Sequence, residues 1–143
     1  MLDVSNLPTD TFKEGENFIF SLKLSNNSND TLVIEPDFIN SSFYEVNDLL
    51  GGTFGQPYSG VWCEFSGAPQ VLQIDPGAHF ILNCPWLLKD GEEPVYPLCK
   101  AESNEILPPG EYYTQMKLDL KVTKSSDKKT IKGSFLRLNF KIE

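Results

Sequence analysis

The sequence predicts an all-β fold, an immunoglobulin-like antiparallel β-sandwich of about eight or nine strands in a single domain covering residues 1–143. Three observations lead to this prediction. Large apolar residues alternate with polar ones at a period of two, the apolar runs are short and bounded by Gly, Pro, Asn or Asp, and no stretch of a dozen residues has a helical period. A closed barrel is the structural alternative, but uneven strand lengths and one long connection favour the sandwich.

The first two strands are predicted at residues 18–24 and 31–35. Phe18, Phe20, Leu22 and Leu24 alternate with polar residues, as in a strand with one buried and one wet face. Residues 31–35 are short and β-branched, and the polar cluster SNNSND between the two runs predicts a hairpin. Further strands, each bounded by turn residues, are expected at 42–46, 60–65, 70–74 and 78–84.

The two longest strands are predicted last, at residues 112–122 and 136–142. Each places apolar residues on one face, and in the final strand these are Leu136, Leu138, Phe140 and Ile142. The charged segment 124–129 between them predicts a solvated hairpin loop. Residues 85–109 contain five prolines and no clear period, which is typical of a long loop.

Composition excludes several classes of protein. With 40% hydrophobic residues the chain has ample material for a core, and its net charge of −8 argues against a nucleic-acid binder. No apolar run is long enough to span a membrane. An acidic, Asn-rich chain that begins with a polar stretch is typical of an exported domain trimmed of its leader. We therefore expect an extracytoplasmic location, in the periplasm or at the cell surface, with the cytoplasm as the alternative.

The chemistry-bearing residues do not form a catalytic constellation. His79, the only histidine, alternates with Phe80, Leu82 and Cys84, so it belongs to the opposite strand face from Cys84 and is expected at the surface. No Cys or His spacing typical of zinc occurs, and the loop carboxylates lack the pattern of a calcium loop. We therefore predict no catalytic residues, no metal and no cofactor.

Two sets of residues leave alternatives open. Cys84 and Cys99 are the preferred disulfide pair, because the bridge would join the ends of the proline-rich segment, and three reduced thiols are the alternative. Five aromatic residues near loops could stack on sugars or anchor a protein partner, or could instead pack over the ends of the sandwich as minor core. These five are Phe54, Tyr58, Trp62, Trp86 and Tyr96.

A turn pattern recurs in QIDPGAHFILNCPW and ILPPGEYYTQMKL, where Pro-Gly precedes an aromatic residue and a strand. Together with EGENFIFSLKLSNNSNDTLVI and GVWCEF, these elements resemble the β-sandwich family that includes the bacterial intracellular proteinase inhibitors. The resemblance covers roughly residues 14–122, whereas the final strand, the cysteines and the long connection depart from the family pattern. It implies a sandwich fold without catalysis, and no inhibitory residue can be matched.

The leading functional hypothesis is therefore a non-catalytic binding or spacer domain of a bacterial extracytoplasmic or surface protein. The alternatives are a proteinase inhibitor and a carbohydrate-binding module that uses the loop aromatic residues. A protein or carbohydrate partner is expected, with no nucleic acid.

Overall fold

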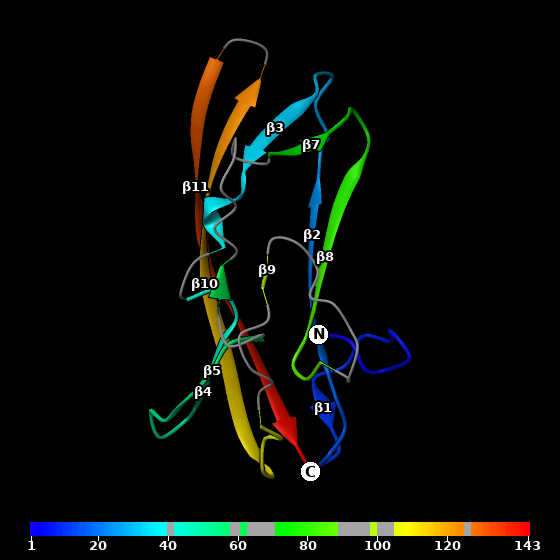
Figure 1. Cartoon of the computed structure of the whole chain (residues 1–143), viewed down its shortest axis with the longest axis vertical. Coiled ribbons are helices and arrows are strands. Elements are labelled where there is room, and N and C mark those ends of the chain that lie inside the picture. The colour runs from blue at the N-terminus through cyan, green and yellow to red at the C-terminus, as the bar shows by residue number, and fades with distance from the viewer. Residues whose placement is uncertain (40–41, 58–60, 63–70, 89–97, 100–104, 125–126) are drawn as a thin grey trace.

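The computed structural model of the chain has eleven strands and one 3₁₀ turn among the residues that it describes (Figure 1). These are residues 1–39, 42–57, 61–62, 71–88, 98–99, 105–124 and 127–143. The elements are β1 (Thr11–Phe12), β2 (Ile19–Ser25), β3 (Leu32–Glu35), η1 (Pro36–Phe38), β4 (Glu45–Asp48), β5 (Thr53–Gly55), β6 (Val61–Trp62), β7 (Leu72–Ile74), β8 (His79–Pro85), β9 (Leu98–Cys99), β10 (Gly110–Lys124) and β11 (Asp127–Ile142).

The main sheet contains seven strands, with β10 at its centre. β10 pairs along one side with β11, and along the other with β3 near one end and β4 near the other. β7 extends the sheet beyond β3, β5 extends it beyond β4, and β1 lies beside the end of β11. The β1 pairing is parallel, so the sheet is mixed and not wholly antiparallel as predicted.

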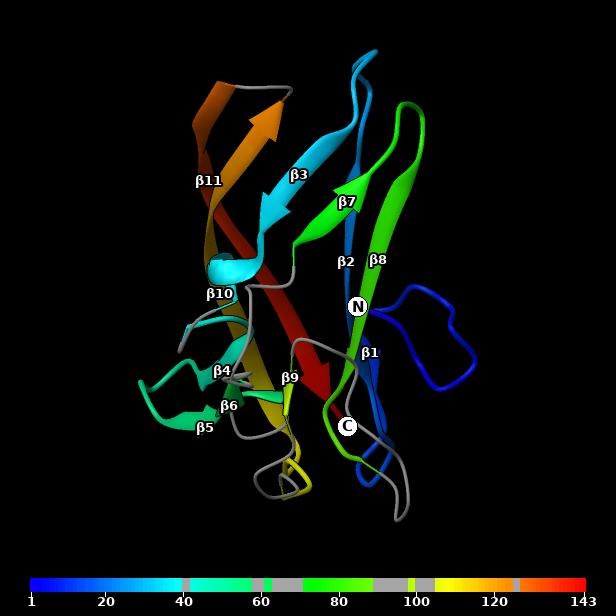
Figure 2. The ribbon, with the colours of Figure 1, turned by 45° about the horizontal axis from the view of Figure 1, so that its top comes forward.

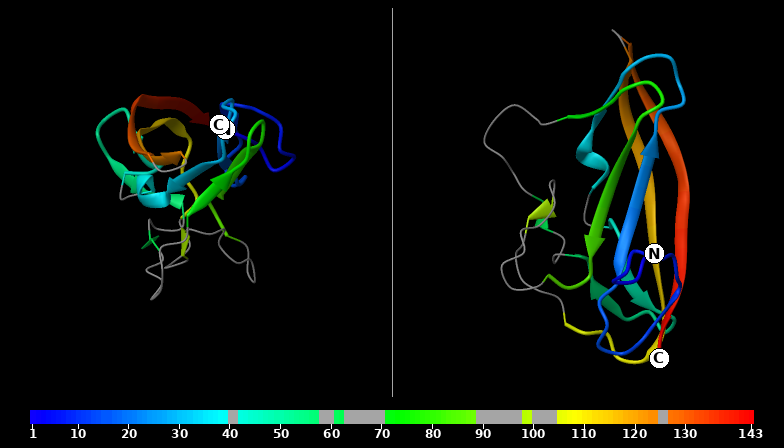
Figure 3. Two further views of the ribbon diagram at one scale, coloured as in Figure 1. Left: turned by 90° about the horizontal axis from the view of Figure 1, so that it is seen from above. Right: turned by 90° about the vertical axis from the view of Figure 1, so that its right-hand side faces the viewer.

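The second layer is the antiparallel pair β2–β8, which lies across the core from β10 and β11 (Figures 2 and 3). Rings from both layers meet between them. Phe20 of β2 stacks on Tyr44 at 4.6 Å between ring centroids, and Phe18 packs against Phe140 of β11 at 5.3 Å. The alternation of Phe18, Phe20 and Leu22 therefore directs one face of β2 into the core, as the sequence predicts.

The hairpin predicted between β2 and β3 is wrong, because these strands belong to different sheets. The chain crosses between the layers at a turn held by Asn26, whose buried side-chain amide donates hydrogen bonds to the carbonyl oxygens of Asp30 (2.8 Å) and Ile74 (2.9 Å). Its side-chain oxygen accepts bonds from the backbone N–H and the hydroxyl of Ser28. These bonds join the β2–β3 turn to the chain at the end of β7, which redirects β3 to the other layer.

The β10–β11 hairpin is longer than predicted, because β11 begins at Asp127 within the segment expected to be a loop. Its ladder contains a β-bulge, where Gly133 and Ser134 lie opposite Leu118 alone. A Cβ at position 133 would lie 1.9 Å from the Leu118 carbonyl oxygen, so only glycine fits there.

Candidate binding surface on β10 and β11

Charge is distributed very unevenly between the β10–β11 hairpin and the rest of the chain. Eight of the twelve Lys and Arg residues lie in residues 110–142, together with only three of the twenty acidic ones. The hairpin thus has a net charge of +5, and the remaining residues have −13. The overall charge of −8 is therefore the sum of a basic hairpin and a strongly acidic remainder of the chain.

Ion pairs neutralise part of this positive charge on the β3 side of the hairpin. Lys121 pairs with Asp37 and, at 3.7 Å, with Glu35, and Lys128 approaches the other oxygen of Glu35 at 3.7 Å. The hydrogen bond from Lys121 to Asp37 raises the pKa of the Lys121 ammonium, so this lysine is a cation at any physiological pH.

Other cations of the hairpin are left without such partners. Lys129, Lys132 and Arg137 lie within 4 Å of no acidic side chain among the described residues. The guanidinium of Arg137 lies over the ring of Tyr113 at 3.9 Å and donates a hydrogen bond to Asn139, which holds it on the outer face of the sheet.

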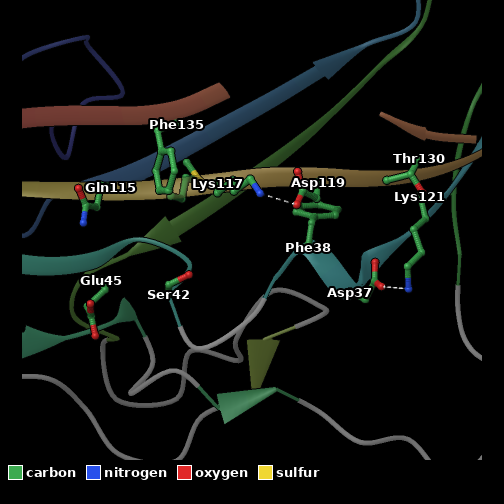
Figure 4. A pocket seen from close by; sticks show the side chains of 11 residues that line it. Asp37, Phe38, Ser42, Glu45, Gln115, Lys117, Asp119, Lys121, Thr130 and Phe135 are labelled. Atoms are coloured by element: carbon green, nitrogen blue, oxygen red, sulfur yellow. Dashed lines mark ion pairs between the residues drawn. The ribbon is translucent and has the colours of Figure 1, made fainter. Parts of the chain in front are cut away.

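A cavity of about 580 Å³ opens on the outer face of the main sheet, where η1 crosses between β3 and β4 (Figure 4). Asp37, Phe38, Ser42 and Glu45 line one side, and β10 and β11 supply the other side through Gln115, Lys117, Asp119, Lys121, Thr130 and Phe135. Lys117 pairs with Asp119 at 3.0 Å, and this hydrogen bond lowers the pKa of the Asp119 carboxyl. Asp119 is therefore a carboxylate at neutral pH.

Four large apolar side chains are exposed along β11. They are Ile131, Phe135, Leu136 and Leu138, with exposed fractions of 47%, 70%, 44% and 38%. The register places Leu136 opposite buried Met116 and Leu138 opposite buried Thr114, so both belong to the inner face, as the sequence predicts. Leu136 and Leu138 are nevertheless exposed, because β11 lies at the margin of the sheet and the β2–β8 layer covers only its end near Phe140.

The outer edge of β11 carries no neighbouring strand over most of its length in the described part of the chain. β1 pairs only with Lys141 and Ile142, and none of the other described strands pairs with β11 on that side. We call the exposed part of this strand the β11 surface, defined by Ile131, Phe135, Leu136, Leu138, Lys129, Lys132 and Arg137.

The structure describes the side chains of two of the five aromatic residues predicted to bind a ligand, Trp86 and Phe54. Trp86 is 2% exposed, stacks on Phe18 at 5.7 Å and donates a hydrogen bond from its indole nitrogen to the carbonyl oxygen of Glu105. It therefore packs as a core residue, which is the alternative predicted for these aromatic rings. Phe54 is partly exposed and packs edge-on against Tyr112.

The remaining predicted aromatic residues fall outside what the structure describes. Tyr58 and Tyr96 lie outside the described residues, and for Trp62 only the backbone, in β6, is described. Their proposed role in ligand binding stays a prediction.

Cys84 and His79 point away from each other on β8. Cys84 is free and fully buried between the two layers, as in the alternative of reduced thiols. Its predicted pairing with Cys99, whose side chain lies outside the described residues, stays a prediction. Burial raises the pKa of the Cys84 thiol to about 12, so it is not a reactive thiolate at neutral pH. His79 is exposed, as the alternation predicts.

Sequence reasoning missed the β11 surface. The total charge of −8 concealed the concentration of Lys and Arg in residues 110–142, which a count along the chain would have found. Periodicity places the apolar residues of the last strand on one face, but it does not report whether another layer covers that face.

The comparisons with known proteins leave the family open: the chain matches no protein-family model, no curated protein and no solved structure. The described residues include no group of three or more His, Cys, Asp or Glu side chains arranged to hold a metal ion. Among the same residues no helix is long and apolar enough to cross a membrane.

Proposed function

We propose that this chain is a non-catalytic binding module of immunoglobulin-like architecture that contacts a protein partner through the β11 surface. The observation that carries the proposal is the exposure of four large apolar side chains along β11, a strand of the basic hairpin whose outer edge has no neighbouring strand over most of its length among the described residues. Neighbouring exposed side chains of this size mark interaction sites more often than single scattered ones. Aromatic and arginine side chains such as Phe135 and Arg137 are also enriched at protein interfaces.

The strand pairings support the immunoglobulin-like architecture. β2 pairs with β8 in one layer, and β3, β10 and β11 are consecutive in the other, which corresponds to the B–E and C–F–G groups of that fold. In addition, the hydroxyl of Tyr112, near the start of β10, donates a 2.6 Å hydrogen bond to the carbonyl oxygen of Pro108. A tyrosine bonded in this way at the start of strand F is a hallmark of such domains.

The electrostatics of the outer cavity support binding over catalysis. Its cations and carboxylates pair with one another at Lys117–Asp119 and Lys121–Asp37. The lowered pKa of Asp119 is opposite to the raised pKa that a carboxyl group needs to act as a general acid.

The proposal can be tested by selecting a random peptide library displayed on phage against the purified domain. We expect enriched peptides that bind the unaltered domain and lose about tenfold or more in affinity for a Phe135→Ser, Leu138→Ser double variant, a loss typical of interface anchors. The matched control is Ile81→Ser. Ile81 is 47% exposed, comparable to the apolar residues of the β11 surface, but it lies on β8 and outside that surface.

Enriched peptides that bind the double variant as well as the unaltered domain would contradict the proposal. A selection that enriches no peptide over a blank surface would contradict it too. Circular dichroism of each variant establishes that the fold is retained before binding is compared.

A further inference from the structure

We propose that the β11 surface binds its partner by strand addition, and that the added strand is an extended polypeptide segment in which apolar and acidic residues alternate. This inference rests on the proposed function and specifies its ligand. It follows from three features of the same strand: the direction of its free backbone groups, the division of its side chains between two faces, and its charge.

The backbone of β11 already accepts a strand at one end. The N–H groups of Lys141 and Glu143 donate hydrogen bonds to the carbonyl oxygens of Asp10 and Phe12, both at 2.8 Å. Backbone groups alternate in direction along a strand, so those of Asn139, Arg137 and Phe135 point to the same edge. No described strand lies there, and an incoming strand would extend the ladder that β1 begins.

The side chains of β11 define what such a strand must carry. Leu136 and Leu138 are exposed on the inner face, so the side chains that an added strand places on that face would cover them and should be apolar. Arg137 belongs to the outer face, where the neighbouring side chains of an added strand should be acidic. Successive residues of a strand face opposite sides, so the two requirements together describe an apolar–acidic alternation.

The charge of the hairpin favours a segment of another protein, and not a second copy of this chain, as the added strand. Lysines and a bulge on an edge strand are common protection against edge-to-edge association. If two β11 strands paired, two hairpins of net charge +5 would be brought together, which like-charge repulsion opposes. The same cations attract an acidic segment, so they both exclude self-pairing and select the partner.

The test uses synthetic peptides of about ten residues in which valine and glutamate alternate between flanking serines, a length typical of one long strand. The strand-addition geometry predicts that this peptide binds and that hydrogen exchange slows at the backbone N–H groups of Phe135, Arg137 and Asn139. A peptide with lysine in place of glutamate should bind at least about tenfold more weakly, because its charges repel those of β11. Methylation of all the valine and glutamate nitrogens should abolish binding, since it removes the donors of both edges of the peptide.

Two variants of one residue separate charge from backbone pairing. Arg137→Pro removes an outward N–H, and proline is tolerated where that group faces solvent, whereas Arg137→Gln removes the same charge and keeps the N–H. We expect Arg137→Pro to bind the Val–Glu peptide about tenfold more weakly than Arg137→Gln does. If Arg137→Pro fails to fold, the methylated peptide tests the same hydrogen bonds on the unaltered domain.

The inference is overturned if the Val–Glu peptide does not bind at millimolar concentration, if the methylated or lysine peptide binds equally well, or if the three amides stay unprotected in the complex. Failure of the inference can be told apart from failure of the proposed function. Library peptides that depend on Phe135 and Leu138 but leave those amides unprotected retain the binding function and reject strand addition. Absence of both results rejects the two proposals together.

Discussion

Thr114 buries a hydroxyl group that finds no hydrogen-bond partner in the described part of the chain. Burying an unsatisfied polar group lowers stability, and valine has nearly the same shape without that group. We predict that Thr114→Val raises the free energy of unfolding by about 1 kcal/mol. Urea titration measures the change, and Thr130→Val, at an exposed position of β11, is the control with no gain expected. An unchanged or lower stability for Thr114→Val would count against an unpartnered hydroxyl.

Cys84 makes stability depend on pH in the alkaline range. Burial raises the pKa of its thiol from 9.0 to about 12, so the folded protein holds this proton more tightly than the unfolded chain. Its contribution is fully present below about pH 9 and is lost as pH rises towards about 12, with a slope of up to about 1.4 kcal/mol per pH unit. Burial also raises the pKa values of Tyr44 and Tyr112, which act in the same direction.

We therefore predict that the free energy of unfolding falls with pH above about 9, and that it falls less steeply in Cys84→Ala. Urea titrations at a series of pH values give the slope of the free energy of unfolding against pH for both proteins. The loss of packing in Cys84→Ala lowers this free energy by the same amount at every pH and leaves the slope unchanged. Equal slopes would mean that Cys84 ionises equally in both states. Titration of thiols in the denatured protein additionally checks for disulfides, since three free thiols would exclude any bridge.

At the scale of the element, the β-bulge in β11 depends on Gly133. An added Cβ would overlap the Leu118 carbonyl oxygen, which belongs to the backbone and cannot rotate away. We predict that Gly133→Ala lowers the free energy of unfolding by about 1–3 kcal/mol, the usual cost of overpacking. Gly110→Ala is the matched change on the same hairpin, where the new atom would lie 3.3 Å from the Tyr112 side chain and should cost less. A Gly133→Ala variant as stable as Gly110→Ala would contradict the bulge geometry.

The turn after β2 depends in the same way on Asn26. Its side chain is fully buried and satisfies two backbone carbonyl groups from separate segments. We predict that Asn26→Ala lowers the free energy of unfolding by about 2–3 kcal/mol, because the buried carbonyl group of Ile74 loses this donor and the turn loses the bonds of the Asn26 side chain. Chemical denaturation checks this, with Asn27→Ala at the exposed neighbouring position as the control. If both variants lost the same free energy of unfolding, the hydrogen bonds of the Asn26 side chain would not account for the stability of the turn.

At the scale of the whole molecule, the two layers are joined by an aromatic core centred on Phe20. This residue is fully buried and contacts rings from the facing layer, whereas Phe135 of β11 is mostly exposed. We predict that Phe20→Ala lowers the free energy of unfolding by roughly 3–5 kcal/mol, while Phe135→Ala changes it by less than about 0.5 kcal/mol. Thermal and urea unfolding measure both variants. A large loss at Phe135 would mean that the β11 surface serves the fold and not a partner.

The division between predicted and observed features follows from the range of the interactions involved. Alternation of apolar residues is a local property, and it correctly assigned the all-β class, most strands and the inner faces of β2, β8, β10 and β11. The immunoglobulin-like assignment, the resemblance to the proteinase inhibitor family and the extracytoplasmic location stay predictions. The β11 surface was not predicted, because its exposure depends on the position of β11 at the margin of the main sheet.

Tertiary structure alone decided which strands are neighbours and which faces are covered. β2 and β3 are adjacent in sequence but belong to different layers, and the side chain of Asn26 bonds the turn between them to the carbonyl oxygen of Ile74 in β7. Leu136 and Phe140 share one strand face, yet only Phe140 is buried, because the second layer reaches that end of β11 alone. A local pattern specifies the direction of a side chain, whereas burial and partner-binding surface depend on distant parts of the chain.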